Sequence, residues 1–161
     1  MRKSMRVWVT RPEEDAAELA EALRAEGIEA PVEPLLRIVY VDGPPLDLAG
    51  TLAAAGFGYR REVLYEARTA DRLSDELAAN LGRGAVDAVL VFSPRTGATL
   101  MRLLQAAGLS TAARRVICFC LSHAVAAAVA PGAWREVVVA KQPTQAAMIS
   151  AIAWARMRLP T

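Results

Sequence analysis

Short polar segments rich in serine, threonine and arginine follow the apolar runs of this chain. The clearest is Ser93-Pro94-Arg95-Thr96, directly after the apolar run 87–92. Serine is a good N-cap, and proline suits the first helical position because its missing N–H would have no intrahelical partner there. Such a helix start presents free N–H groups and the positive end of the helix dipole, which attract anions. These residues therefore indicate the binding of carboxylates or similar groups.

Similar segments follow the other apolar runs. Thr10 and Glu13 have the spacing of a capping box at a helix start. Two interpretations of Arg11 and Arg95 stay open, as clamps for an anion or as solvated arginines of a first helical turn. The candidate anion-binding residues are Thr10, Arg11, Ser93, Arg95, Ser122, His123 and Thr144.

One further pair of side chains could do covalent chemistry. Cys120 and His123 would form a nucleophile and base beside a helix start, where the pKa of a thiol falls. The alternative is a small buried residue that ends a strand, followed by an exposed histidine. The alternative is favoured because no third, orienting group can be identified. With Cys118, the chain has only two cysteines and one histidine, too few for a structural zinc site or a disulfide framework, so no metal site is expected.

The elements that position these residues alternate between strand and helix. Apolar runs predict five main strands near 6–10, 28–36, 87–92, 115–120 and 136–140, and helical periodicity separates them, as in Ala16, Leu19, Ala20 and Leu23. This alternation predicts an α/β protein with a single doubly wound, flavodoxin-like, five-stranded parallel sheet in the order 2-1-3-4-5. The candidate residues then gather at the carboxyl edge of that sheet.

Composition excludes several classes of protein. The net charge is +2 and aromatic residues make up 6%, with no basic stripe, so no nucleic-acid partner is expected. No apolar run approaches the ~18 residues of a membrane span, and no signal peptide is recognisable, so we expect a cytoplasmic protein that does not insert into membranes. Dinucleotide-binding and P-loop glycine patterns are absent from the sequence.

Five segments in order resemble the uroporphyrinogen-III synthase family. Val9-Thr10-Arg11-Pro12, before an alanine-rich helix, resembles the opening of that family, and Val63-Leu64-Tyr65-Glu66-Ala67 resembles its valine-tyrosine strand. Val91-Phe92-Ser93-Pro94 resembles the end of its phenylalanine-serine-proline strand. The other two segments are Cys120-Leu121-Ser122-His123-Ala124 and Pro143-Thr144.

The resemblance implies a two-domain architecture from which this chain departs. Family members have a second α/β domain inserted into the first through a two-stranded ladder. Here we expect a single α/β domain, 1–161, built from 6–40 and 67–158. A short helix and strand at 41–66 would be the remnant of the inserted domain. Residues 35–41 and 61–67 should form the antiparallel ladder, which the short helix near 46–55 closes.

The resemblance also implies an activity. The family cyclises hydroxymethylbilane to uroporphyrinogen III and inverts the last pyrrole ring through a spiro intermediate, without cofactor or metal. The substrate carries eight carboxylates, which the seven candidate residues would hold. By the same resemblance, Tyr65 is the candidate proton donor to the departing hydroxyl, since a phenol of pKa ~10 can donate at neutral pH. A tyrosine that only closes the ladder is an equal alternative.

Loss of one domain would remove one wall of the family's cleft, and with it substrate contacts and the exclusion of water. Three interpretations follow: a shortened synthase with weak activity, a homodimer through the exposed ladder in which a second copy supplies the wall, or a binding module without catalysis. The alternative function is thus a flavodoxin-like module that binds anions or tetrapyrroles without catalysis. A third possible function is an interaction domain that uses the apolar short helix as its contact surface.

Overall fold

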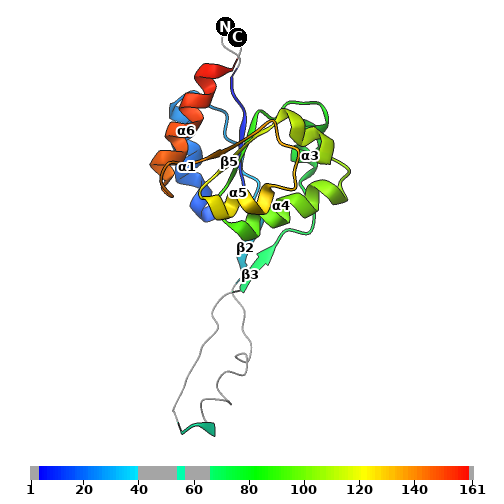
Figure 1. The fold of residues 1–161 in the computed structure, drawn as a ribbon, viewed down its shortest axis with the longest axis vertical. Coiled ribbons are helices and arrows are strands. Elements are labelled where there is room, and N and C mark those ends of the chain that lie inside the picture. The colour runs from blue at the N-terminus through cyan, green and yellow to red at the C-terminus, as the bar shows by residue number, and fades with distance from the viewer. Residues whose placement is uncertain (1–3, 40–53, 57–65, 160–161) are drawn as a thin grey trace.

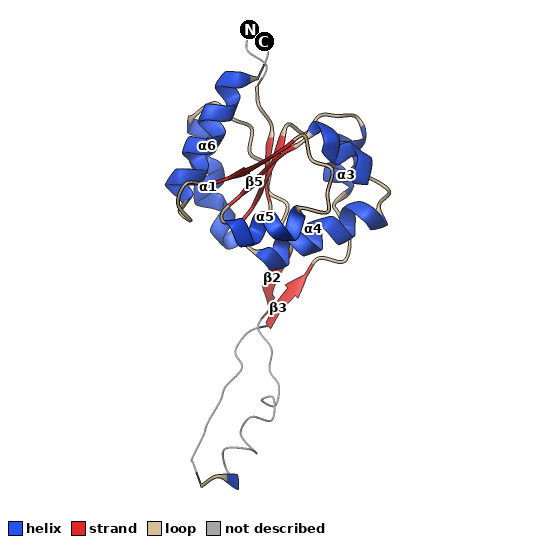
Figure 2. Ribbon diagram, viewed as in Figure 1, coloured by secondary structure: helices blue, strands red, loops and turns tan. Residues whose placement is uncertain are grey.

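The central element is a parallel sheet with helices on both faces (Figures 1 and 2). The computed structural model describes residues 4–39, 54–56 and 66–159. Its sheet has the order β1-β4-β5-β6. The strands are β1 Val7–Val9, β4 Ala88–Val91, β5 Ile117–Cys120 and β6 Glu136–Val139, and all three neighbouring pairs are parallel.

Two layers of helices cover the sheet. Helices α1 Glu13–Ala25 and α6 Gln145–Arg158 lie on one face (Figure 2). The other face carries α3 Asp75–Gly82, α4 Pro94–Ala106 and α5 His123–Val129, with a short 3-10 helix at Ser110–Arg115. The α/β class and the parallel sheet predicted from the sequence are therefore confirmed.

Strand side chains alternate between two apolar cores. Leu90 and Phe119 pack with α1 and α6, whereas Val89, Cys118 and Cys120 pack with α3, α4 and α5. Both β4 and β5 are buried along their whole length, because parallel strands with helices on both faces have no solvent-facing side. This explains why the apolar runs near 87–92 and 115–120 are unbroken.

The predicted count of five parallel strands is not confirmed, because the segment 28–36 does not form a continuous strand beside β1. It makes only two isolated parallel bridges, Arg6 with Glu29 and Val9 with Val32. Backbone bonds join Val7 N to Glu29 O and Val9 N to Pro31 O. Between these two bonds, a regular parallel ladder would have a bond donated by the backbone nitrogen of residue 31. Residue 31 is a proline, which has no N–H to donate.

The predicted antiparallel ladder is present. Strand β2 Leu36–Val39 pairs with β3 Glu66–Thr69, with Leu36 opposite Thr69 and Val39 opposite Glu66. The second strand extends to Thr69, two residues beyond the predicted end at Ala67. The prediction ended with the apolar residues, but a two-stranded ladder with solvent-exposed positions accommodates Arg68 and Thr69 equally well. The rest of the predicted ladder and the short helix near 46–55 lie largely outside the described residues.

The predicted N-cap Ser93 is confirmed, and the predicted N-cap Thr10 is wrong. Ser93, Ser122 and Thr144 cap α4, α5 and α6, each accepting a bond from the N–H three residues ahead. Thr10 does not cap α1, whose N-cap is Pro12. The hydroxyl of Thr10 instead donates to the carbonyl of Leu90, so this buried residue links β1 to β4. Tertiary pairing therefore overrides the local capping-box signal.

A buried carboxylate holds the start of α3. Glu33 is 6% exposed and accepts hydrogen bonds from both the backbone N and the Oγ of Ser74, the N-cap of α3, at 2.7 and 2.5 Å. Glu33→Ala should lower the free energy of unfolding by about 1–3 kcal/mol, because the Ser74 N–H loses a charged acceptor in a partly buried place. Urea denaturation measures the change. The control Glu21→Ala, on the exposed face of α1, should stay within about 0.5 kcal/mol of the parent. Equal losses in the two variants would contradict the proposed cap.

Candidate functional site

The carboxyl ends of the four strands meet at one edge of the sheet. Val91 lies opposite Cys120, and Cys120 opposite Val139, so the helix starts that follow β4, β5 and β6 share this edge. The ladder begins there as well, because Leu35 N donates to the carbonyl of Thr10 at 3.5 Å. Figure 1 shows the ladder projecting from the body of the protein. We call this region the carboxyl edge.

The helix starts at the carboxyl edge differ in charge. The first turn of α1 holds Glu13, Glu14 and Asp15, which compensate the positive end of its dipole. The first turns of α4, α5 and α6 contain no acidic residue. The attraction for anions therefore belongs to α4, α5 and α6. The acidic run 13–15 is the sequence signal that distinguishes α1 from the other three helix starts.

Arg11 connects three segments of the carboxyl edge. Its guanidinium lies over the ring of Phe92, 4.4 Å from the centroid, and Nη1 donates to Oε1 of Gln145 at 3.3 Å. Gln145 is the first residue of α6, and Phe92 precedes the N-cap of α4. A cation is thus held between two helix starts that both favour anions, which supports the interpretation of Arg11 as an anion clamp.

Arg95 extends toward the ladder instead. Its Nη2 donates to the carbonyl of Ala67 in β3 at 2.9 Å. It also lines a cavity of about 940 Å³ between the ladder, the segment that leads to α3 and the start of α4, which we call the ladder hollow. Four arginines line this hollow, Arg37, Arg68, Arg72 and Arg95, and so do four acidic residues, Glu33, Glu66, Asp71 and Glu76.

The arginines of the ladder hollow are only loosely held by acidic partners. Arg68 pairs with Glu66 at 3.2 Å and Arg72 with Asp75 at 3.5 Å, and all four side chains are more than half exposed. Exposed pairs of this kind contribute about 0–1 kcal/mol, so a ligand carboxylate can replace the acidic partner at little cost. Sequence reasoning missed Arg37, Arg68 and Arg72, although their positions on or beside the predicted ladder could have identified them.

The hydroxyl groups of the candidate residues are mostly occupied. Ser93 Oγ accepts from Thr96 N at 3.1 Å and donates to Thr96 Oγ1 at 2.8 Å. Thr144 Oγ1 accepts from Ala147 N at 3.2 Å. These side chains shape the helix starts, which leaves the backbone N–H groups as the anion donors. Thr10 is fully buried and its hydroxyl donates to Leu90, so this hydroxyl is not free to hold a ligand, and a contribution of Thr10 to the site through the backbone stays a prediction.

Cys120 and His123 do not form a nucleophile pair. Cys120 is buried against Cys118, with the two Sγ atoms 3.8 Å apart, whereas His123 is exposed at the first position of α5. The hydrogen bond with Cys120 and burial both raise the pKa of the Cys118 thiol, whereas the same hydrogen bond lowers the pKa of Cys120. Cys120 is nevertheless fully buried, so no substrate can reach its sulfur. Cysteines buried in this way are unreactive, as the favoured interpretation of the sequence expected.

The remaining candidates separate into two groups. Ser122 and His123 start α5 and Thr144 starts α6, all at the carboxyl edge with Arg11 and Ser93, whereas Arg95 belongs to the ladder hollow. Tyr65 lies outside the described residues. Its neighbour in the sequence, Glu66, lines the ladder hollow. Among the residues that the structure describes, no helix is both long and apolar enough to cross a membrane.

This geometry defines an α/β protein with a flavodoxin-like parallel sheet, a projecting ladder and a cationic carboxyl edge. The family described as uroporphyrinogen-III synthase HemD matches residues 5–150 of the 161. The chain therefore belongs to the uroporphyrinogen-III synthase family.

Solved structures agree in fold. A mutant uroporphyrinogen III synthase from the extremely thermophilic bacterium Thermus thermophilus is similar with a TM-score of 0.67 at 12% identity, covering 97% of this chain and 100% of the other. A second structure of the Thermus thermophilus enzyme gives a TM-score of 0.63 at 12% identity and covers 94% and 99%. At this identity the likeness shows the fold alone. None of the curated proteins matches the chain.

Proposed function

We propose that the protein cyclises hydroxymethylbilane to uroporphyrinogen III, with inversion of the last pyrrole ring. The observation that carries this proposal is the family match, which runs from before β1 into α6 and so includes every element of the carboxyl edge. The charge pattern of the described residues agrees with a substrate of eight carboxylates, because the starts of α4, α5 and α6 lack acidic residues. The cytoplasmic location and the independence from cofactors stay predictions.

The substrate carboxylates would divide between two groups of cations. Arg11 and His123, together with the free N–H groups of α4, α5 and α6, would hold one part of the linear tetrapyrrole along the carboxyl edge. Arg95 and the ladder arginines would hold the other part. Held at both ends, the chain would be folded for attack by the substituted carbon of the last ring, and this orientation is the main catalytic contribution, since unassisted closure gives the uninverted isomer.

Tyr65 would begin the reaction by acid catalysis. Its phenol would give a proton to the hydroxyl of the substrate, which leaves as water and generates an azafulvene cation. Attack on that cation gives the spiro intermediate, which fragments and closes again as isomer III. In the sequence, Tyr65 directly precedes Glu66, the first residue of β3.

We also propose that 41–66 stands where relatives insert a second domain, and that a second copy of the chain supplies the absent wall through the ladder. The described ladder strands have exposed positions, including Ile38 with 41% of its surface exposed, which suits association between copies. Sedimentation equilibrium tests this step: the mass should double with concentration, and Ile38→Lys should keep it monomeric. A monomer at all concentrations would contradict the dimer without affecting the assignment of the reaction.

The isomer assay tests the proposed function itself. Hydroxymethylbilane is generated in situ, the protein is added, the products are oxidised, and the porphyrin isomers are separated by chromatography. Isomer III above the protein-free blank establishes the synthase. Isomer I alone, at concentrations up to those at which the protein dimerises, would refute the activity and leave the binding module as the better interpretation.

Two arginines of α4 provide a matched test of substrate binding. Arg95 donates to the carbonyl of Ala67 and lines the ladder hollow, whereas Arg102 donates to the carbonyl of Ala70 but does not line it. Arg95→Gln should raise KM about tenfold, the effect of one charge-assisted hydrogen bond to a carboxylate, and Arg102→Gln should leave KM unchanged. Initial rates of isomer III formation give both values, and equal effects would exclude the hollow as a binding site.

A further inference from the structure

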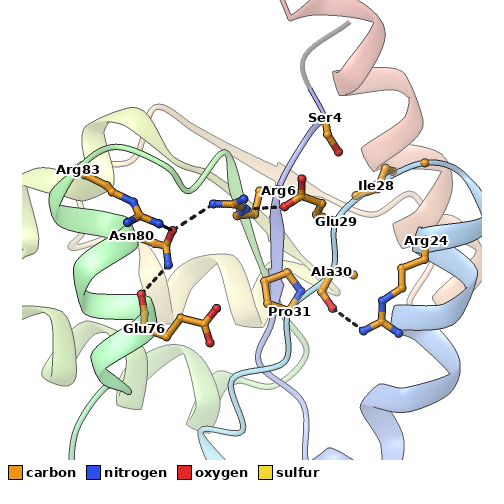
Figure 3. Close-up of a pocket in the computed structure, with 11 residues that line it drawn as sticks. Ser4, Arg6, Arg24, Ile28, Glu29, Ala30, Pro31, Glu76, Asn80 and Arg83 are labelled. Carbon is orange, nitrogen blue, oxygen red and sulfur yellow. Dashed lines mark hydrogen bonds and ion pairs between the residues drawn. The ribbon is translucent and has the colours of Figure 1, made fainter.

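A second polar cavity lies at the opposite edge of the sheet, before the strands begin. Its volume is about 560 Å³, and it lies between the segment 27–31 and α3 (Figure 3). Three of its charged and amide side chains belong to α3 or its C-cap, and the others come from other parts of the chain; they are Arg6, Arg24, Glu29, Glu76, Asn80 and Arg83. We call it the Asn80 pocket. None of the candidate substrate-binding residues lines it.

The Asn80 side chain organises this pocket. Asn80 is 4% exposed, and its Nδ2 donates to the carbonyl of Glu76, one helical turn earlier, at 2.7 Å. This bond determines the orientation of the amide, because the carbonyl can only accept. Oδ1 therefore faces the pocket, where it accepts from Arg6 Nη1 at 3.1 Å and from Arg83 Nη2 at 2.7 Å.

Two guanidinium groups thus converge on one neutral oxygen. Each guanidinium has five N–H donors, and Asn80 accepts only one from each. Arg6 is partly neutralised by Glu29, with Nε to Oε2 at 2.7 Å. Within the described part of the chain Arg83 has no carboxylate partner, so its charge is not compensated by an ion pair. The like charges repel each other, and an anion that receives their unused donors would relieve this repulsion.

The opposite wall adds a third cation. Arg24 Nη2 donates to the carbonyl of Ala30 at 3.4 Å, and Figure 3 shows Arg24 and Arg83 on opposite sides of the Arg6–Glu29 pair. The three arginines exceed the two acidic residues by one charge. The Glu76 side chain points toward Pro31 rather than toward the Asn80 amide in Figure 3, so the cationic part of the pocket is the part around Asn80.

We propose that the Asn80 pocket binds a small oxyanion, a phosphate or a carboxylate group, between Arg83 and Arg6. Two planar guanidinium groups held by a common acceptor suit the paired oxygens of either group. Arg24, across the pocket, would contact the rest of the ligand. The pocket shares Glu76 with the ladder hollow but none of the cations proposed to hold the substrate, and it does not depend on the proposed reaction.

Isothermal titration calorimetry with inorganic phosphate, and separately with acetate, tests the proposal on the full chain. Arg83→Gln should weaken binding about tenfold or more, because it removes charge-assisted donors. Asn80→Asp should abolish binding, because the new carboxylate would compensate Arg83 while Glu29 already compensates Arg6. Arg135→Gln, an exposed arginine outside the pocket, removes the same charge and should change nothing.

Each outcome decides the question. Loss of binding in Arg83→Gln with retention in Arg135→Gln supports the site, and the anion that binds identifies phosphate or carboxylate as the ligand group. Equal affinity in the parent and Arg83→Gln overturns the proposal, as does the absence of binding by both anions. Circular dichroism confirms that each variant is folded, and Arg83→Gln suffices if Asn80→Asp does not fold.

Discussion

Tyr65→Phe is expected to lower the rate of uroporphyrinogen III formation by about 10²-fold or more, the usual contribution of a general acid. The substitution removes only the phenolic O–H and keeps the aromatic ring. If Tyr65 protonates the leaving hydroxyl, the loss should fall on kcat, with KM nearly unchanged, because the proton moves only during the chemical step. The product should shift toward isomer I as unassisted closure overtakes the enzyme.

Tyr59→Phe is the matched control, since it deletes the same atom six residues earlier in the sequence. It should retain the parent's rate. A Tyr65→Phe variant as active as the parent would refute the role of proton donor and favour the alternative, in which Tyr65 only closes the ladder. Equal losses in both variants would indicate damage to the segment rather than loss of an acid.

Phe119→Ala is expected to lower the free energy of unfolding by about 3–5 kcal/mol. Phe119 is fully buried in β5, which lies between β4 and β6, and it packs in the core under α1 and α6. Truncation removes the buried ring and leaves a cavity that helices on a four-stranded sheet cannot readily fill. Urea denaturation measures the change, and an unchanged m-value shows that the same surface unfolds.

Met157→Ala is the control, because Met157 in α6 is 71% exposed, and we expect a change within about 0.5 kcal/mol. A loss below about 1.5 kcal/mol for Phe119→Ala would contradict a tightly packed core at this strand. Since β5 leads directly to Ser122, the cap of α5, the variant should also lower activity at temperatures where the parent is stable.

Local signals predicted much of the fold. The unbroken apolar runs of β4 and β5 were recognisable because both faces of these strands are covered. The cap Ser93 was recognisable because a cap contacts a backbone N–H three residues ahead. The fifth strand was predicted but does not form a continuous ladder. Pro31 interrupts the ladder only if its nitrogen faces β1, and the sequence alone does not show which side of the segment faces β1.

The candidate site was predicted less completely, because its residues meet only through the fold. Sequence alone determined the α/β class, the start of α4 and the family, since each depends on residues close together in the chain or on segments in a recognisable order. Only the tertiary structure decided three hydrogen bonds: Thr10 donates to the carbonyl of Leu90, Arg11 donates to Gln145, and Arg95 donates to a carbonyl of the ladder. These contacts join residues 28 to 134 positions apart, and no local pattern encodes which partner a long side chain meets across a sheet edge.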